Sequence, residues 1–315
     1  MKHVFIINPV SGKSDARALM PEIEAACGKA GVEPVFEITG APKHAVEITR
    51  GHSAAGEAVR LYAVGGDGTL NEVFEGAWRY PNAEVASIPC GSGNDFVRSF
   101  GQPEDFLDFD AQLAGAAYPI DLIEVDGGVC AAITSTGLDA EVAYNIPKYR
   151  RIPLLGGTMA YNISIVEKLL KPLGKRLRVT IDGEAFEDTL LIATVCNAQH
   201  YGGGYQAGPM ALLDDGVLDV ILVKKISRLL IASVIGKYKR GNHWVNGAID
   251  PGLSHLFTHR RAKEVLIEPT GTEPFILNVD GECGPAKRLF AKVMPKAARF
   301  VLPAAMVPNA PLLGK

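Results

Sequence analysis

The sequence predicts two domains: an α/β domain with a parallel sheet, followed by an all-β domain of antiparallel strands. In the first third of the chain, apolar runs of strand length alternate with helix-like segments, which is typical of a parallel sheet covered by helices. After about residue 120, short β-rich stretches follow one another, and several end at Asp-Gly turns. The 315 residues are enough for each domain to bury its own core.

The elements of the first half follow from these runs in order. The expected strands are Val4–Ile7, Val35–Ile38, Leu61–Val64 and Val85–Ile88. The expected helices are one that starts after a Ser14 N-cap and places Leu19, Ile23, Ala26 and Ala30 on one face, then Ala45–Ala55 and Leu70–Trp78.

In the second half, the expected strands cover 120–125, 177–181, 190–195, 217–223, 264–267, 275–279 and 299–302. Asp-Gly pairs at 126–127, 182–183 and 280–281 predict tight hairpin turns, which favour a sandwich of antiparallel strands. A single helix, Thr158–Leu170, is expected to interrupt them.

Composition argues against several classes of protein. The net charge of −3 provides no global field that would attract nucleic acid. The five cysteines are scattered without a C-x-x-C pair, so neither a disulfide framework nor a zinc site is expected. No apolar run approaches the ~20 residues of a spanning helix, and the N-terminal stretch Met1–Ile7 lacks the length and the small-residue cleavage site of a signal peptide. We therefore expect a cytoplasmic protein without a transmembrane segment.

Three glycine-rich loops follow predicted strand ends, at Asn8–Lys13, Gly65–Asn71 and Pro89–Phe96. Ligands of open α/β sheets bind outside the carboxyl ends of the strands, where helix N-termini favour anions. Glycines allow backbone N–H groups to approach phosphate oxygens, although none of the loops is a Walker A loop. A single loop of this kind is often only a turn. Three loops at one edge of a sheet predict a nucleotide site, with Asp67 near a nucleotide-bound metal.

Acidic residues form a second group, at Asp121, Asp214-Asp215 and Asp280-Gly281-Glu282. Carboxylates and backbone carbonyls suit a hard cation such as Mg²⁺. Ordinary Asx turns and a hairpin turn explain the same residues. From the residues alone, both interpretations stay open.

The sequence resembles the diacylglycerol kinase catalytic-domain family, specifically its compact bacterial lipid kinases. The matching stretches are Asn8–Gly12, Gly65–Val73, Pro89–Phe96, Ile120–Leu122, Gly137–Ala140, Leu213–Val220 and Val279–Glu282. Gly-Gly-Asp-Gly-Thr alone is shared with NAD kinases and, more loosely, with phosphofructokinases. The early Asn-Pro-x-Ser-Gly and the late Asp-Gly-Glu narrow the resemblance to lipid kinases.

The resemblance implies a Rossmann-like three-layer α/β domain, of the NAD kinase and phosphofructokinase type, over residues 1–122. A C-terminal β-sandwich that receives the lipid would cover 123–297, and residues 298–315 would return to the first domain. ATP would bind between the two domains.

By the same resemblance, site residues can be assigned. ATP contacts would come from Asn8, Pro9, Ser11, Gly12, Lys13, Thr39, Gly65, Gly66, Asp67, Gly68, Thr69, Leu70, Asn71 and Ser92. A structural Mg²⁺ would be held by Leu212, Asp215 and Val217, and Asp67 and Asp121 would support the catalytic Mg²⁺ network. Glu282 matches the family's proton acceptor, Asp67 is the rival base, and Asp280 is grouped with them as catalytic.

The implied activity is ATP- and Mg²⁺-dependent phosphorylation of a hydroxyl group on a membrane lipid, with diacylglycerol favoured and phosphatidic acid the product. Phosphatidylglycerol and a sphingoid base stay open as acceptors, and an NAD kinase or an inactive lipid-binding protein is an alternative. The enzyme would work at the inner face of the membrane, and a homodimer stays open. Two stretches mix apolar and basic residues and could contact the bilayer, Tyr149–Leu155 and Leu229–Arg240, although their apolar sides could equally pack inside the sandwich.

Overall fold

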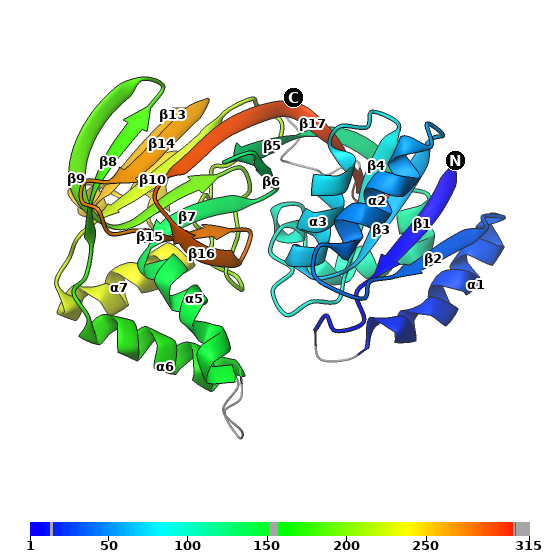
Figure 1. Cartoon of the computed structure of the whole chain (residues 1–315), viewed down its shortest axis with the longest axis horizontal. Coiled ribbons are helices and arrows are strands. Elements are labelled where there is room, and N and C mark those ends of the chain that lie inside the picture. The colour runs from blue at the N-terminus through cyan, green and yellow to red at the C-terminus, as the bar shows by residue number, and fades with distance from the viewer. Residues whose placement is uncertain (13–14, 151–156, 305, 307–315) are drawn as a thin grey trace. The chain divides into compact units, whose positions relative to one another are not determined.

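The computed structural model describes residues 1–12, 15–150, 157–304 and 306. The chain forms two compact units (Figure 1). The first contains 1–122, 212–216 and the chain from 294 onward, and the second contains 123–211 and 217–293. The first unit is an α/β domain and the second is a β-sandwich, so the predicted fold class is confirmed.

The first unit has a parallel sheet with the order β2-β1-β3-β4. Its strands are β1 (Lys2–Ile7), β2 (Pro34–Ile38), β3 (Val59–Gly65) and β4 (Ala83–Pro89). All seven residues of β3 and of β4 are buried, as expected for central strands with helices on both faces. The four predicted strands are confirmed, and each is longer than the apolar run that predicted it.

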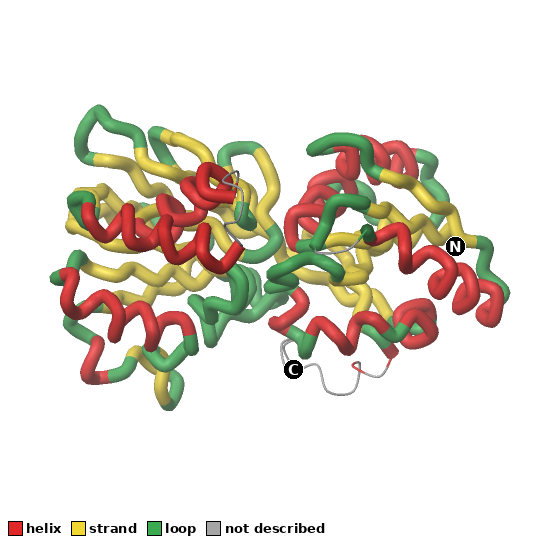
Figure 2. The backbone as a smooth tube through the Cα atoms, turned by 90° about the horizontal axis from the view of Figure 1, so that it is seen from below, coloured by secondary structure: helices red, strands yellow, loops and turns green. Residues whose placement is uncertain are grey.

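Helices cover both faces of this sheet, and Figure 2 shows the strands between two layers of helices. The helices are α1 (Met20–Ala30), α2 (His44–Ala54), α3 (Asp67–Ala77) and α4 (Phe109–Leu113), with 3₁₀ turns at Ala16–Leu19, Val97–Ser99 and Pro103–Leu107. On the α1 face, Phe5, Ile7, Tyr62 and Val64 form a core with Ile23 and Cys27. The predicted cap, Ser14, lies outside the described residues, and the first 3₁₀ turn is capped by Asp15, whose side chain accepts from the Arg17 N–H.

The end of β17 (Leu289–Leu302) completes the sheet beside β4, where Phe300 pairs in parallel with Val85. On the face opposite the α1 core, the Phe300 ring lies 5.1 Å from that of Phe96 and 5.3 Å from that of Phe100. Two further rings, Phe74 and Phe106, lie 6.0 and 6.3 Å from it. This aromatic cluster holds the late segment of the chain in the first unit.

The second unit is antiparallel, with the strand order β16-β15-β7-β9-β8-β14-β17 and β10 and β13 added beyond β9. Its strands are β7 (Ile133–Gly137), β8 (Lys175–Ile181), β9 (Glu184–Cys196), β10 (Leu218–Lys224), β13 (Phe257–Ala262), β14 (Glu264–Pro269), β15 (Phe275–Val279) and β16 (Glu282–Ala286). Two hairpins accompany them. One pairs β5 (Ala116–Val125) with β6 (Gly128–Cys130), and the other pairs β11 (Trp244–Val245) with β12 (Ala248–Ile249). The core contains inward-facing residues such as Val179, Val195, Val220 and Val265.

The three predicted Asp-Gly turns are confirmed. Both central residues have positive φ at 126–127, 182–183 and 280–281, as a two-residue hairpin of type I′ requires. The prediction of a single helix in this half is wrong. Besides α6 (Gly157–Leu170), the unit contains α5 (Leu138–Arg150), α7 (Arg228–Lys239) and a 3₁₀ turn at Pro251–Leu253. None of the helices in the described part of the chain is long and apolar enough to cross a membrane.

Candidate active site

Three turns meet at the carboxyl edge of the parallel sheet. They follow β1, β3 and β4, and the turns after β3 and β4 are joined by a 2.9 Å hydrogen bond from the Cys90 N–H to the Gly65 carbonyl. A side-chain carbon at Gly12 would overlap the Cys90 carbonyl, and one at Gly91 would overlap the Cα of Gly66. The glycines are therefore required by backbone-to-backbone packing, and the three loops predicted to converge lie against one another.

Polar side chains of the predicted site lie on this edge. The Asn8 amide donates to the Thr69 hydroxyl at 3.0 Å, and the Asn8 side-chain oxygen accepts from the Val10 N–H. Thr39 continues the edge, because its N–H donates to the carbonyl of Ile7, the last residue of β1. Asn8, Thr39 and Thr69 are thus brought together from three separate stretches of the chain.

Helix α3 begins at Asp67, immediately after Gly66, so its N-terminus lies at the same edge. Free backbone N–H groups and the helix dipole favour an anion there. Nothing lies within 4 Å of the position that a side chain of Gly68 would occupy. Leu70 and Asn71 are one turn further along and are buried, so Leu70 is part of the core.

Asp67 lies beside a second carboxylate, Asp95. A side chain at Gly93 would come within 2.9 Å of an Asp67 oxygen and 3.3 Å of an Asp95 oxygen, so both groups lie around this glycine. Burial, and then the Asp95 charge, raise the pKa of Asp67 to about 6, although the Phe96 N–H donates to it at 3.1 Å. Arg98 lies 3.7 Å from Asp95. Two neighbouring carboxylates that are largely shielded from solvent are typical of a cation or proton-transfer site.

Sequence reasoning did not select Asp95 as a site residue, although it lies in the third glycine-rich loop. The remaining predicted nucleotide contacts are Pro9 and Ser11, which are half-buried in the first turn, and Ser92, which is exposed in the third. Lys13 lies outside the described residues.

Asp121 closes a loop within the first unit. Its carboxylate accepts from the Gly216 N–H at 2.6 Å and from the Lys296 N–H at 2.8 Å, while its own N–H donates to the Leu213 carbonyl. Burial raises the pKa of Asp121, and these two amide hydrogen bonds oppose the rise. Asp121 therefore holds the 212–216 loop, which carries Leu212 and Asp215, and Val217 follows directly.

The donors predicted for Mg²⁺ at this loop fit a hard cation, because two backbone carbonyls and one carboxylate are all oxygen ligands. No group of three or more His, Cys, Asp or Glu side chains able to hold a metal occurs in the described part of the chain. A metal at the loop would therefore depend on main-chain oxygens.

Asp280 and Glu282 belong to the β15–β16 hairpin of the second unit and differ in their surroundings. The Asp280 carboxylate accepts from the backbone N–H groups of Ala131, Ala132 and Ile133 and from the Cys130 thiol. Burial raises the pKa of Asp280, and these donors oppose the rise. Glu282 follows the turn and is exposed. The hairpin therefore uses Asp280 as an anchor and presents Glu282 outward.

A buried row of polar side chains supports the same turn. The Asn278 side-chain oxygen accepts from the Gly281 N–H at 2.9 Å, and its amide donates to the Ser135 hydroxyl at 3.2 Å. Ser135 donates in turn to Asp139 at 2.6 Å, and Tyr201 donates to the same Asp139 oxygen at 2.7 Å. Sequence reasoning missed these contacts, and Asp139 appeared only within the Gly137–Ala140 stretch of the resemblance.

Comparison with known proteins gives matches over both units. The family model "Diacylglycerol kinase catalytic domain" matches residues 2–125, and "YegS C-terminal NAD kinase beta sandwich-like domain" matches 132–302. The chain is 31% identical to a "Probable lipid kinase YegS-like" of Pseudomonas aeruginosa PAO1 over 93% of its length and 91% of that protein. It is 29% identical to a "Diacylglycerol kinase" of Bacillus subtilis 168, over 90% of this chain and 91% of that protein. A crystal structure of a diacylglycerol kinase from Bacillus anthracis Sterne has the same fold, with a TM-score of 0.69, 19% identity, and coverage of 97% of this chain and 98% of that one.

Proposed function

Because the chain belongs to the diacylglycerol kinase catalytic-domain family and is a lipid kinase, we propose that it transfers the γ-phosphoryl group of ATP, with Mg²⁺, to the hydroxyl of diacylglycerol. The observation that supports this most is the packing of three glycine turns at one sheet edge beside the N-terminus of α3. Such an edge offers backbone N–H donors to the phosphates of a nucleotide.

We assign the phosphate contacts to the turns at Asn8–Gly12, Gly65–Thr69 and Ser92, with Asn71 one helical turn further along α3 and Thr39 on the same edge. Asn8 and Thr69 are linked to each other and supply neutral donors. Asp67 would help to hold Mg²⁺, and we add Asp95, which lies around the same glycine. When bound, Mg²⁺ neutralises charge on the triphosphate oxygens.

We assign proton acceptance from the lipid hydroxyl to Glu282 rather than to Asp280. The Asp280 carboxylate already accepts four hydrogen bonds, so it is better suited to fixing the turn than to exchanging a proton. Asn278 holds the other side of the turn through Gly281. In-line transfer depends on such fixed geometry, because the reacting groups must lie close together and aligned.

Labelled ATP and Mg²⁺, mixed with diacylglycerol, phosphatidylglycerol, sphingosine or NAD, test the assignment directly. Phosphate is expected on diacylglycerol. Transfer to another lipid would mean that this lipid is the acceptor and that the protein is still an ATP-dependent lipid kinase. Transfer to NAD alone would refute the proposal.

The chain offers a matched control for Glu282. Glu184 also follows a type I′ Asp-Gly turn, is exposed, and begins a strand, β9. Glu282→Gln is expected to reduce transfer on the order of 10²–10⁴-fold, the range for a lost general base. Glu184→Gln is expected to keep full activity. Equal activity of the two variants would exclude Glu282 as the base.

A further inference from the structure

Four apolar side chains lie exposed at the end of α6 and the start of α7. Leu229 is 94% exposed and Leu170 77%, and Val166 and Leu230 are 57% and 52% exposed. A single exposed leucine needs no explanation, but a group of them marks an interaction surface. In contrast, Ile231 on the other side of α7 is buried, so the helix packs by a different face.

Arg228 joins the two helix ends into one surface. Its guanidinium donates to the Leu169 carbonyl at 2.6 Å and to the Lys171 carbonyl at 2.9 Å. These carbonyls lie at the C-terminus of α6, where a cation is favoured by the helix dipole. A hollow of about 490 Å³ lies beside this junction, lined by Pro172, Leu173, Lys225, Ile226, Ser227 and Arg228. We call the surface of Val166, Leu170, Lys171, Lys225 and Arg228–Leu230 the α6–α7 tip.

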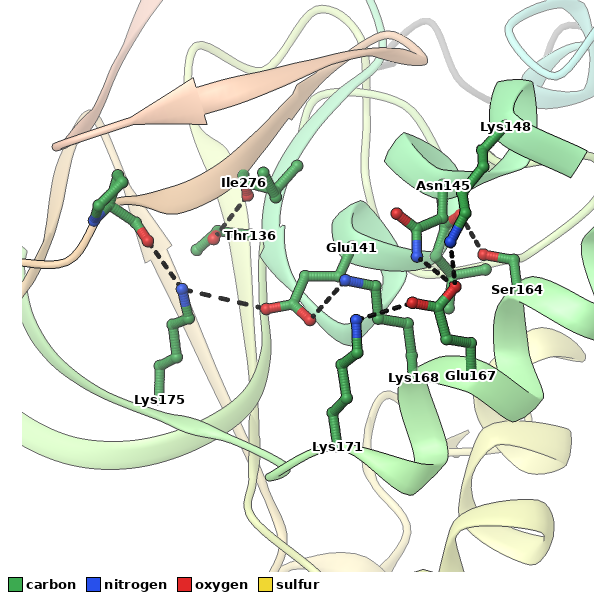
Figure 3. A network of polar contacts seen from close by, with 12 residues as sticks. Thr136, Glu141, Asn145, Lys148, Ser164, Glu167, Lys168, Lys171, Lys175 and Ile276 are labelled. Carbon is green, nitrogen blue, oxygen red and sulfur yellow. Dashed lines mark hydrogen bonds and ion pairs between the residues drawn. The ribbon is translucent and has the colours of Figure 1, made fainter.

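The α6–α7 tip is basic at its margin. Its charged members are Lys171, Lys225 and Arg228, and Lys171 is 54% exposed. The neighbouring carboxylates, Glu141 on α5 and Glu167 on α6, are already paired with lysines, as Figure 3 shows. Glu167 contacts Lys171 at 2.7 Å and Lys148 at 3.3 Å, and Glu141 contacts Lys168 at 3.4 Å. The tip therefore combines apolar side chains with three basic ones, of which Lys171 shares the single carboxylate of Glu167 with Lys148.

From this combination we propose that the α6–α7 tip docks the enzyme on a bilayer that contains anionic phospholipid; the inference rests on the lipid acceptor proposed above. Leucines enter the boundary between headgroups and acyl chains, while lysines and arginines remain at the level of the phosphates. A second copy of the chain is a poorer occupant, because a twofold contact would place two basic tips against each other.

Sedimentation with vesicles measures docking without turnover. The wild-type protein is expected to bind vesicles of equal parts phosphatidylcholine and phosphatidylglycerol more tightly than vesicles of phosphatidylcholine alone. Leu229→Glu combined with Leu230→Glu is expected to weaken binding by at least about tenfold, because both leucines leave the interface and two negative charges enter it. Leu107→Glu, at an exposed leucine of the first unit, is the matched control and is expected to bind as the wild type does.

A second pair of variants tests the charge. Lys171→Gln and Lys225→Gln are each expected to weaken binding to the mixed vesicles on the order of fivefold, and not to weaken binding to phosphatidylcholine alone. The melting temperatures of these variants should equal that of the wild type, since the substituted residues are all exposed, namely Lys171, Lys225, Leu229 and Leu230. Vesicle binding equal to that of the wild type in the double leucine variant would overturn the proposal. So would a wild-type dimer that this variant converts to a monomer.

Activity separates this inference from the proposed function. With diacylglycerol embedded in mixed vesicles, the double leucine variant should lose activity in proportion to binding. With a short-chain diacylglycerol dispersed in water, it should keep wild-type activity, and loss of that activity as well would overturn a docking role. If the wild-type protein phosphorylates neither form, the proposed acceptor is wrong, and vesicle binding still decides whether the tip docks.

Discussion

Replacing Asp67 by Asn should stabilise the protein while removing its activity. Burial and Asp95 raise the pKa of Asp67 from 3.8 to about 6, so ionised Asp67 is disfavoured in the folded state. A difference of about two pKa units corresponds to ~3 kcal/mol at neutral pH. Because Asn keeps the size of the side chain and an acceptor for the Phe96 N–H, we expect Asp67→Asn to raise the free energy of unfolding by about 1–3 kcal/mol.

The pH dependence of this gain has a definite sign. The folded-state pKa is the higher one, so between about pH 4 and pH 6 the folded protein holds a proton that the unfolded chain has lost. The stability of the wild-type protein therefore falls as the pH rises through this window, and the full penalty is present above it. The difference between Asp67→Asn and wild type should be near zero at about pH 4 and maximal at about pH 8.

Calorimetric melting at several pH values, with chelator and without nucleotide, measures this difference. Each kcal/mol corresponds to roughly 2–4 °C in melting temperature for a domain of this size. Asp110→Asn is the control, because the Asp110 side chain is 60% exposed in the same unit and should change stability by less than about 0.5 kcal/mol. Phosphate transfer by Asp67→Asn should fall on the order of 10²–10³-fold. A variant less stable than wild type at about pH 8 would refute the reasoning.

Four other substitutions test the fold and the site. Gly91→Ala should weaken ATP binding, measured by calorimetric titration, because the new Cβ would overlap the Cα of Gly66. Gly28→Ala is the control on α1, where a Cβ meets open space. It should stabilise the protein by about 0.5–1 kcal/mol, measured by unfolding in denaturant. Phe300→Ala should cost about 3–5 kcal/mol in the same denaturant measurement, and a loss below about 1 kcal/mol would mean that the aromatic cluster closes without it. His243 is buried, which lowers its pKa to about 4, so the wild type should lose up to ~3 kcal/mol as the pH falls from about 6.5 through 4. The melting temperature of His243→Gln should fall less over that window, and equal falls would contradict this role.

The sequence was most informative where local signals and the fold agree. The apolar runs of the first half predicted all four parallel strands, and for β3 and β4 the reason is that a strand buried on both faces has no polar side to interrupt it. The Asp-Gly pairs predicted three type I′ turns for a similar reason, since Asp and Gly tolerate positive φ. The convergence of the glycine turns followed from the rule that parallel strands end at one edge.

Two helices of the second unit and several contacts between distant residues were harder to predict. Helix α5 contains Pro147, which counts against a helix by local propensity, and α7 begins with exposed leucines that do not match a buried stripe. The Asp95 carboxylate and the Asn278–Ser135–Asp139 row depend on neighbours brought together by folding. Asp-Gly-Glu occurs at 182–184 as well as at 280–282, and only the surroundings distinguish them. Asp182 is exposed and accepts from two backbone N–H groups, whereas Asp280 is half-buried and accepts from three backbone N–H groups and a thiol.

The pairing of Phe300 with Val85 has a consequence for synthesis on the ribosome. The two partners are 215 positions apart, so the edge of β4 and the rings around Phe96 stay uncovered while the intervening chain is translated. Local contacts can form early, but this last strand must close a long loop, which is slow. During that interval the nascent chain offers a chaperone an open strand edge next to aromatic side chains.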